Sequence, residues 1–416
     1  MNIQVLSILV LAIMFAIATA LPVNIGALAF AAAFIVGNVA GGMTPAEIFS
    51  GFPGDLFVTL VGITYLFAIA QKNGTIDLLV AGAVRLVRGR VAAIPWIMFL
   101  VAAVLTALGA LGPAAVAILA PIALRFAAQH RISPLMMGLM VIHGAQAGAF
   151  SPTSVYGGIV NGVVAKAGLA SDPGALFLSS LAFNFAIAVV VFLVLGGLEC
   201  LRRSPEPAPE VPSAPAPGFT PQIIATLGGL IALAVCSLGL GFNVGLVAVT
   251  IAVGLTLLSP GEQKGAVDKI SWSTVLLICG VITYVAVMQK IGAVDLTGKA
   301  ISGLPSPLLA GLLLCFTAAV VSAFASSTAL LGVLIPLGAP LLMEGQIGAV
   351  GLVCAISIST TIVDTSPFST NGALVVANAS AEERDRLLRG LLIYTAVIAV
   401  AGPLLAYGLL VLPGLL

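Results

Sequence analysis

The sequence predicts an all-α polytopic membrane protein, an inverted-topology repeat with two re-entrant helical hairpins and two interrupted spans. The first observation is composition: 60% of the 416 residues are hydrophobic and only 7% are charged, whereas soluble chains carry about 25% charged residues. The second is length, since many apolar runs reach the roughly 20 residues that cross a bilayer. The third is internal similarity between the two halves. A net charge of +1 favours no nucleic-acid partner.

The internal similarity follows a constant spacing. Ser-Pro-Thr-Ser at 151–154 and Ser-Pro-Phe-Ser at 366–369 lie 215 residues apart, and Gly157 and Gly372 share this offset. Chance explains such agreement poorly. We therefore predict that the chain contains two copies of one unit.

The predicted boundaries are a first repeat at 1–200, a second repeat at 221–416 and a Pro-rich cytoplasmic linker at 201–220. Composition supports the linker, because a Pro/Ala/Glu stretch forms neither a helix nor a core. The first 20 residues could also pass for a signal peptide. They lack a basic start, and the repeat requires them as its first span.

Each half is predicted to contain three spans, a hairpin, an interrupted span and a last span. In the first half these are 3–22, 25–40, 55–71, the hairpin at about 92–128, the interrupted span at about 132–168, and 174–199. In the second half they are 221–238, 243–258, 271–289, the hairpin at about 305–343, the interrupted span at about 347–379, and 387–412. A short amphipathic segment with Arg85, Arg88 and Arg90 follows the third span and is most simply an interfacial anchor.

The distribution of cations supports the hairpins. If the broken stretches are hairpins, each half crosses five times, so the second half is inverted. One side then receives Lys72, Arg85, Arg88, Arg90, Arg125, Arg131, Arg202, Arg203, Lys264, Lys269, Arg384, Arg386 and Arg389, and the other receives Lys166, Lys290 and Lys299. This bias marks the first side as cytoplasmic. The first hairpin then opens from the cytoplasm and the second from outside, with both termini outside.

The interruptions predict a transport site. Inverted repeats with broken helices are typical of secondary transporters, and non-helical backbone at membrane depth lines a cavity or is buried in protein. The hairpins turn at 109–113 and 325–329, and Ser151-Pro152 and Ser366-Pro367 share a cap-then-proline form. Four half-helix N-termini would meet there and attract an anion. Ser, Thr and Gly also join membrane helices, which is the structural alternative.

Asp364 is the sharpest single residue, because a carboxylate inside a membrane is costly and usually functional. It lies beside a half-helix C-terminus, where free carbonyls suit sodium. A cation ligand, a protonation site and a structural partner all remain open for it. His143 fits an interhelical hydrogen bond better than a cavity ligand. The five cysteines show no CxxC pair and fit small buried hydrophobes.

The second hairpin tip carries a family resemblance. Ser-Ser-Thr-Ala followed by proline (Ser326 to Pro336) resembles the Ser-Asn-Thr tip of the divalent anion/sodium symporters of the ion transporter superfamily. The element order extends the similarity over essentially the whole chain. The short first span and the Ser-Pro-x-Ser motifs are most similar to malonate and dicarboxylate carriers of the MatC type. At the first tip the match fails, since Leu111-Gly112-Pro113 stand there.

The resemblance implies an elevator-type homodimer, with sodium at each tip and a dicarboxylate between the tips. The predicted substrate-binding residues are Gly112, Pro113, Ser151, Thr153, Ser154, Ser327, Thr328, Ser366, Ser369, Thr370 and Asn371. The predicted sodium ligands are Asp364, Thr365, Ser326, Thr328 and Ser151. Because Ala149 occupies the repeat position of Asp364, the second sodium site is expected to be the stronger.

The expected function is sodium-coupled symport of a small dicarboxylate, malonate or a C4-dicarboxylate, across the bacterial inner membrane. Na⁺ is the transported coupling ion. Proton-coupled transport or exchange of another small organic anion is the alternative, and a channel fits less well because channels repeat selectivity elements around a pore axis. No HExxH or GxSxG motif supports an enzyme.

Overall fold

The structure, a computed structural model, describes residues 2–85, 90–203, 218–261, 263–294, 296, 306–324, 326–343 and 347–414. In these ranges every regular element is a helix. Seven described helices are long and apolar enough to cross a bilayer, and further shorter apolar helices accompany them. The chain is a multi-pass membrane protein, as predicted. Predictions for Arg88, Lys299 and linker residues 204–217 lie outside the described residues.

The first half begins with five helices and then enters the predicted hairpin. These are α1 (Ile3–Ala20), α2 (Ile25–Ala32), α3 (Pro45–Phe49), α4 (Gly54–Lys72) and α5 (Thr75–Arg85). The hairpin consists of α6 (Ala93–Ala107) and α7 (Gly112–Gln129), and α8 (Pro134–Gly148), α9 (Val155–Lys166), α10 (Pro173–Val194) and α11 (Gly197–Arg202) follow. The predicted spans at 25–40 and 174–199 are each subdivided. A π-helical turn at Ala33–Ala40 continues α2, and Gly196, at φ 100°, separates α10 from α11.

The described helices of the second half begin after the linker. Its first helices are α12 (Pro221–Ala234), α13 (Val244–Leu258) and α14 (Trp272–Lys290). The hairpin consists of α16 (Pro307–Ser322) and α17 (Ser327–Met343), and α18 (Ala349–Ile362), α19 (Thr370–Ala377) and α20 (Ala381–Leu410) follow. The last helix begins before the predicted start at 387, because its first turns are charged but still helical.

Local chemistry explains the first hairpin tip. Gly109 adopts φ 113°, a conformation that side chains rarely adopt, and α6 ends there. Gly112 and Pro113 open α7. Proline suits the first turn because an N–H group there would have no intrahelical acceptor, so its absence costs no hydrogen bond. The chain therefore reverses between Ala107 and Gly112, as predicted.

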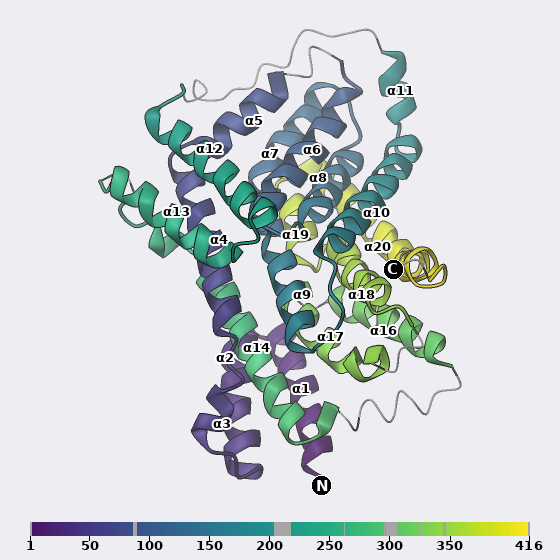
Figure 1. The fold of residues 1–416 in the computed structure, drawn as a ribbon. Helices are drawn as coiled ribbons and strands as arrows, with labels where there is room; N and C mark the ends of the chain where they lie inside the picture. Colours follow the sequence, from purple (N-terminus) through teal and green to yellow (C-terminus); the bar gives the residue numbers. More distant parts are fainter. Residues whose placement is uncertain are drawn as a thin grey trace.

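The two halves exchange contacts. Each hairpin packs on the interrupted span of its own half, α6 and α7 on α8 and α16 and α17 on α18, while α19 packs on α7 and α9 packs on α17. Among the remaining helices α4 packs on α13, and α14 packs on α2. Figure 1 shows α6, α7 and α8 at the end with α11, and α16 and α17 nearer the end with the N-terminus.

Glycines make the closest of these contacts possible. A Cβ at Gly26 of α2 would lie 2.1 Å from the carbonyl oxygen of Leu276, and one at Gly245 of α13 would lie 2.6 Å from Cα of Thr59. Neither contact leaves room for a side chain. The backbones of α2 and α14, and of α13 and α4, therefore touch directly, which is typical of membrane helices joined through small residues.

Candidate substrate and cation site

The breaks in the two interrupted spans have the same hydrogen-bonded shape. Ser154 caps α9: its hydroxyl donates to the carbonyls of Ala149 and Ser151 and accepts from Gly157 N–H at 3.1 Å. Ser369 caps α19 in the same way, donating to the carbonyls of Asp364 and Ser366 at 2.6 and 2.7 Å.

The prediction that Ser151 and Ser366 each cap a helix directly before a proline is wrong. Ser151 and Ser366 are not the helix caps, because each returning helix starts one turn later, at Val155 and at Thr370. Ser366 instead accepts from Phe368 N–H at 3.2 Å, inside the break. The hydroxyls of Ser154 and Ser369 have their hydrogen bonds made within the chain. We assign them to the shape of the breaks and not to direct ligand contact.

Asp364 lies where the second break meets the second hairpin tip. Its side chain is buried, at 7% exposure, and one carboxylate oxygen accepts a hydrogen bond from the hydroxyl of Ser327. The single hydroxyl proton of Ser327 is used in the bond to Asp364. In the 2.8 Å contact between Ser322 and Ser327, Ser322 is therefore the donor. The carboxylate is therefore oriented by the two ends of the hairpin tip. No described residue forms an ion pair with it, since the one described ion pair lies elsewhere.

The second tip also borders an open cavity of about 350 Å³. Three predicted site residues line it: Ser326 from the tip, and Ser369 and Thr370 from the second break. The opposite wall comes from α1, α2 and α14. This volume is at the lower end of the range for small-molecule sites, so the cavity suits a small ligand.

The first tip offers a different surface. The N-terminus of α7 has no side-chain cap, which leaves its first amide groups without partners from a capping side chain. Gly112 faces the Asn371 side chain, whose Nδ2 would lie 3.6 Å from a Cβ at position 112. Asn371 is buried, and its Oδ1 has no hydrogen-bond partner among the described residues. A buried polar atom without a partner is costly, and because an amide oxygen only accepts, a hydrogen-bond donor or a cation would satisfy it.

The first break joins the first tip through Thr153. Its hydroxyl donates to the carbonyl of Ala107, the last residue of α6, at 2.8 Å. The Ser151 hydroxyl bonds to Thr153 at 3.0 Å. Ser151 and Thr153 therefore lie beside the end of α6, and the Thr153 hydroxyl proton is already used in the hydrogen bond to Ala107.

Tyr156 is a site residue that the sequence analysis missed. It lies in the first turn of α9, is 7% exposed, and its hydroxyl accepts from the Thr328 hydroxyl at 3.3 Å. At the 215-residue offset its counterpart is Asn371. This pairing was the available signal, because both positions follow a break by the same number of residues.

Thr365 has a different environment from the one predicted. Its hydroxyl contacts Thr395 of α20 at 3.3 Å and the carbonyl of Ile362 at 3.5 Å. The side chain thus joins the second break to α20. Only its backbone remains available to a cation.

His143 makes interhelical hydrogen bonds, as expected. Its ring nitrogens contact Asn184 Oδ1 of α10 at 3.0 Å and the Tyr394 hydroxyl of α20 at 2.6 Å. Four cysteines are buried and Cys236 is partly buried. Among the described residues no group of three His, Cys, Asp or Glu side chains gathers. A cation at Asp364 would therefore have oxygen ligands, from one carboxylate, hydroxyls and carbonyls.

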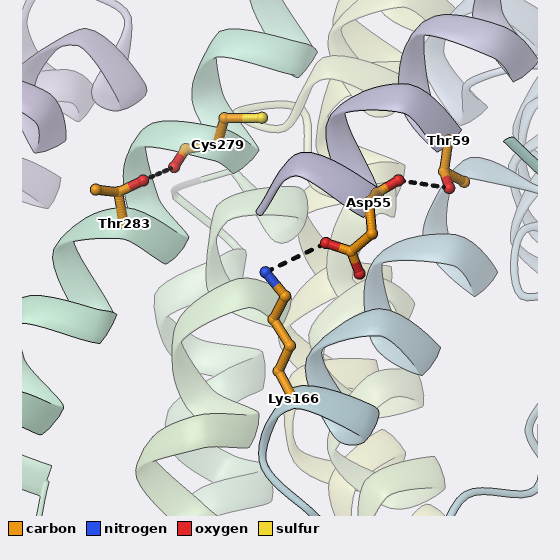
Figure 2. Close-up of polar contacts among 5 residues, drawn as sticks. All are labelled: Asp55, Thr59, Lys166, Cys279 and Thr283. Carbon is orange, nitrogen blue, oxygen red and sulfur yellow. Dashed lines mark hydrogen bonds and ion pairs between the residues drawn. The ribbon is translucent and has the colours of Figure 1, made fainter. Parts of the chain in front are cut away.

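The described ion pair links the first interrupted span to α4. Figure 2 shows Lys166 at the end of α9 reaching Asp55 at the start of α4, at 3.3 Å. The Asp55 carbonyl accepts from Thr59 at 2.9 Å. Two glycines of α9 also face α4, because a Cβ at Gly162 would lie 2.4 Å from Leu56 and one at Gly158 would lie 3.1 Å from Thr59.

Comparisons with known proteins agree with this architecture. Residues 1–149 match the family model described as the dicarboxylate carrier protein MatC N-terminus. The fold is similar to the crystal structure of the Alcanivorax borkumensis YdaH transporter, with a TM-score of 0.62, 15% sequence identity and 98% of each chain covered. The search of curated proteins found no match. The predicted resemblance to MatC-type carriers is therefore confirmed over residues 1–149, and the chain has a fold similar to that of a solved transporter.

Proposed function

We propose that this chain is a secondary active transporter that moves a small dicarboxylate, malonate or a four-carbon acid, together with sodium. The substrate class comes from the MatC match over residues 1–149. The observation that carries the coupling is the buried carboxylate of Asp364, hydrogen bonded to Ser327 at the meeting point of a break and a hairpin tip.

Asp364 supplies the cation side of the site. A buried carboxylate without an ion-pair partner is unfavourable unless another charge compensates it. Sodium takes oxygen ligands as other hard cations do, and Asp364, the Ser326 and Thr328 hydroxyls and nearby carbonyls offer them. The described chain places no Lys or Arg in the breaks, so a bound cation is the compensation that the site lacks.

The first tip supplies the donor side. The uncapped amides at the start of α7 carry partial positive charge, and Asn371 adds an amide directly opposite Gly112. Together with the second tip this gives two separated polar surfaces. With a cation bound at Asp364, both surfaces attract an anion, so the pair fits a ligand with a carboxylate at each end.

Movement is proposed to follow the elevator scheme, in a homodimer in the bacterial inner membrane with both termini outside. The α4–α9 contact supports it. Gly158 and Gly162 have no side chains to interlock with α4. The side chains of Lys166 and Asp55 are 38% and 54% exposed, respectively. Exposed ion pairs contribute little to stability, about 0–1 kcal/mol. The contact can therefore break at low cost when α9 moves.

A proton in place of sodium is the second candidate, and the same observation supports it. A lone buried carboxylate with one hydroxyl donor also suits a group that is neutralised by protonation. The two candidates differ only in what neutralises Asp364.

Uptake by the purified protein in proteoliposomes tests the proposal. Radiolabelled malonate and succinate are offered with and without an inward sodium gradient at constant pH. We expect accumulation that requires the sodium gradient. Accumulation driven only by a proton gradient would support the second candidate, and transport of neither acid under any gradient would contradict the substrate class.

A further inference from the structure

A crevice of about 430 Å³ lies between the start of α8, the end of α10 and the first turns of α20. None of its lining residues is a residue of the candidate site. Three charged side chains line it, Glu383, Arg386 and Arg389. Most of the remaining wall is apolar, from Leu135, Leu195, Leu387 and Ile393, and Ser133, Pro134 and Gly390 complete it.

The sequence of α20 indicates where this crevice lies relative to the hydrocarbon core of the bilayer. Residues 382–389 include six charged residues, whereas 390–410 include none. These 21 residues span about 31 Å at 1.5 Å per residue, which equals the hydrocarbon thickness of a bilayer. Arg389 therefore lies at the boundary of the hydrocarbon, Arg386 lies about one turn outside it, and Ile393 lies inside it.

The crevice thus crosses the boundary between headgroups and acyl chains. From Glu383 to Ile393 the helix rises about 15 Å. The lining is charged at one end and apolar at the other, and Ile393 is 67% exposed. A ligand that fits both ends must itself be amphiphilic, so neither a soluble anion nor a plain acyl chain satisfies the whole surface.

At the charged end, hydrogen-bonding groups remain available to a ligand. Neither Arg386 nor Arg389 forms an ion pair or side-chain hydrogen bond with another described residue. Glu383 accepts one hydrogen bond, from the Ser380 hydroxyl at 3.2 Å, which leaves its other oxygen available. Two guanidinium groups bind a phosphate well, and the carboxylate beside them favours a cation.

We propose that this crevice binds one phospholipid whose headgroup carries both a phosphate and a primary ammonium. Arg386 and Arg389 hold the phosphate, Glu383 accepts from the ammonium, and one acyl chain follows Leu387 and Ile393 into the bilayer. Clusters of basic residues beside membrane helices are established recognition elements for lipid headgroups. Here the additional carboxylate selects an ethanolamine-type headgroup over a purely anionic one.

The close approach of the helices makes the crevice a fixed feature. A Cβ at Gly390 would lie only 2.8 Å from Leu135 Cδ2, so α20 and α8 touch directly beside the lipid position. Arg203 fixes the turn before α8 by donating to the carbonyl of His130 at 2.5 Å and of Arg131 at 3.3 Å. The walls are therefore in place before a lipid arrives.

Native mass spectrometry of the purified full-length chain tests this inference, with added phosphatidylethanolamine, phosphatidylglycerol or phosphatidylcholine. We expect one retained phosphatidylethanolamine per chain. The double variant Arg386→Gln, Arg389→Gln should bind it roughly 30-fold more weakly, from about fivefold for each interfacial arginine. Arg384→Gln is the matched control, because Arg384 lies on the same helix, is exposed and does not line the crevice.

Glu383→Gln separates the two headgroup contacts. It should reduce the preference for phosphatidylethanolamine over phosphatidylglycerol and leave phosphate-dependent retention in place. Equal lipid retention by the arginine double variant and the Arg384→Gln control would overturn the site. A wild-type preference for phosphatidylglycerol would overturn the role of Glu383. If inorganic phosphate alone raised the melting temperature as much as the lipid does, the amphiphilic ligand would be wrong.

Discussion

Replacing Asp364 by asparagine tests the proposed coupling site most directly. Asparagine has nearly the same shape and keeps an oxygen that can accept from the Ser327 hydroxyl. The backbone of the break is unaffected, because the contact from Ser369 is to the Asp364 carbonyl. The substitution therefore removes the charge and leaves the geometry.

The size of the effect follows from burial. At an effective dielectric of about 20, a cation about 4 Å from a carboxylate gains about 4 kcal/mol. Desolvation of both groups offsets part of this gain, and Asp364 is 7% exposed. We expect a net loss of about 1.5–3 kcal/mol, which corresponds to a sodium requirement raised about 10- to 150-fold.

The assay is a sodium titration of dicarboxylate uptake in proteoliposomes at constant pH. Half-activation should move to much higher sodium in Asp364→Asn, and the affinity for the dicarboxylate at saturating sodium should change less. Asp385→Asn is the control, since Asp385 is an exposed carboxylate on α20. An unchanged sodium requirement in Asp364→Asn would refute the assignment. Loss of pH dependence without any sodium effect would point to a proton instead.

Two further predictions test the helix contacts. Asp55→Lys and Lys166→Asp should each change the initial uptake rate by up to about fivefold, because exposed ion pairs contribute at most about 1 kcal/mol. Exchanging both residues should restore the wild-type rate. If the double variant differs from wild type as much as either single variant does, the ion pair does not matter. Gly148→Ala should lower the melting temperature in detergent, because its Cβ would lie 1.9 Å from the Ala103 carbonyl oxygen and overpacking costs about 1–3 kcal/mol. Gly228→Ala, in open space, should not lower it, and equal melting temperatures would contradict the close α6–α8 contact.

The positions of the breaks were predictable from sequence because they depend on local chemistry. Gly109 and Pro113 interrupt an apolar run in a way that no continuous helix permits, and the structure places the first tip between them. The Ser-Pro-x-Ser motifs likewise marked both interrupted spans. What local chemistry could not give was the width of each break, so the wrong serine was taken as the helix cap.

Side-chain partners were less predictable, because they depend on which distant segments meet. Thr365 is adjacent to Asp364, and proximity in sequence suggested a shared ligand. In the structure it contacts Thr395 of α20, a helix that the sequence analysis treated only as a last span. Tyr156 was missed for the same reason, since its contact with Thr328 is set by the packing of α9 on α17.

The 215-residue offset separates residues that shape the breaks from residues that differ between them. Two pairs are identical and make equivalent backbone contacts: Ser154 with Ser369, and Gly157 with Gly372. A Cβ at Gly157 would lie 2.0 Å from the Ser151 carbonyl oxygen, and one at Gly372 would lie 2.1 Å from that of Ser366. Neither glycine can therefore be replaced without moving backbone, whatever ligand is bound.

The unlike pairs lie where the tips and breaks face each other. They are Gly112 with Ser327, Ala149 with Asp364, and Tyr156 with Asn371. A duplicated backbone would give two equivalent sites, but these substitutions place a carboxylate at one tip and leave backbone amides without a side-chain cap at the other. Binding a dicarboxylate together with a cation needs this difference. One surface must offer oxygen ligands to the cation, and the other must donate hydrogen bonds to a carboxylate. In the proposed function, the residues that differ between the two halves are therefore the ones expected to set selectivity.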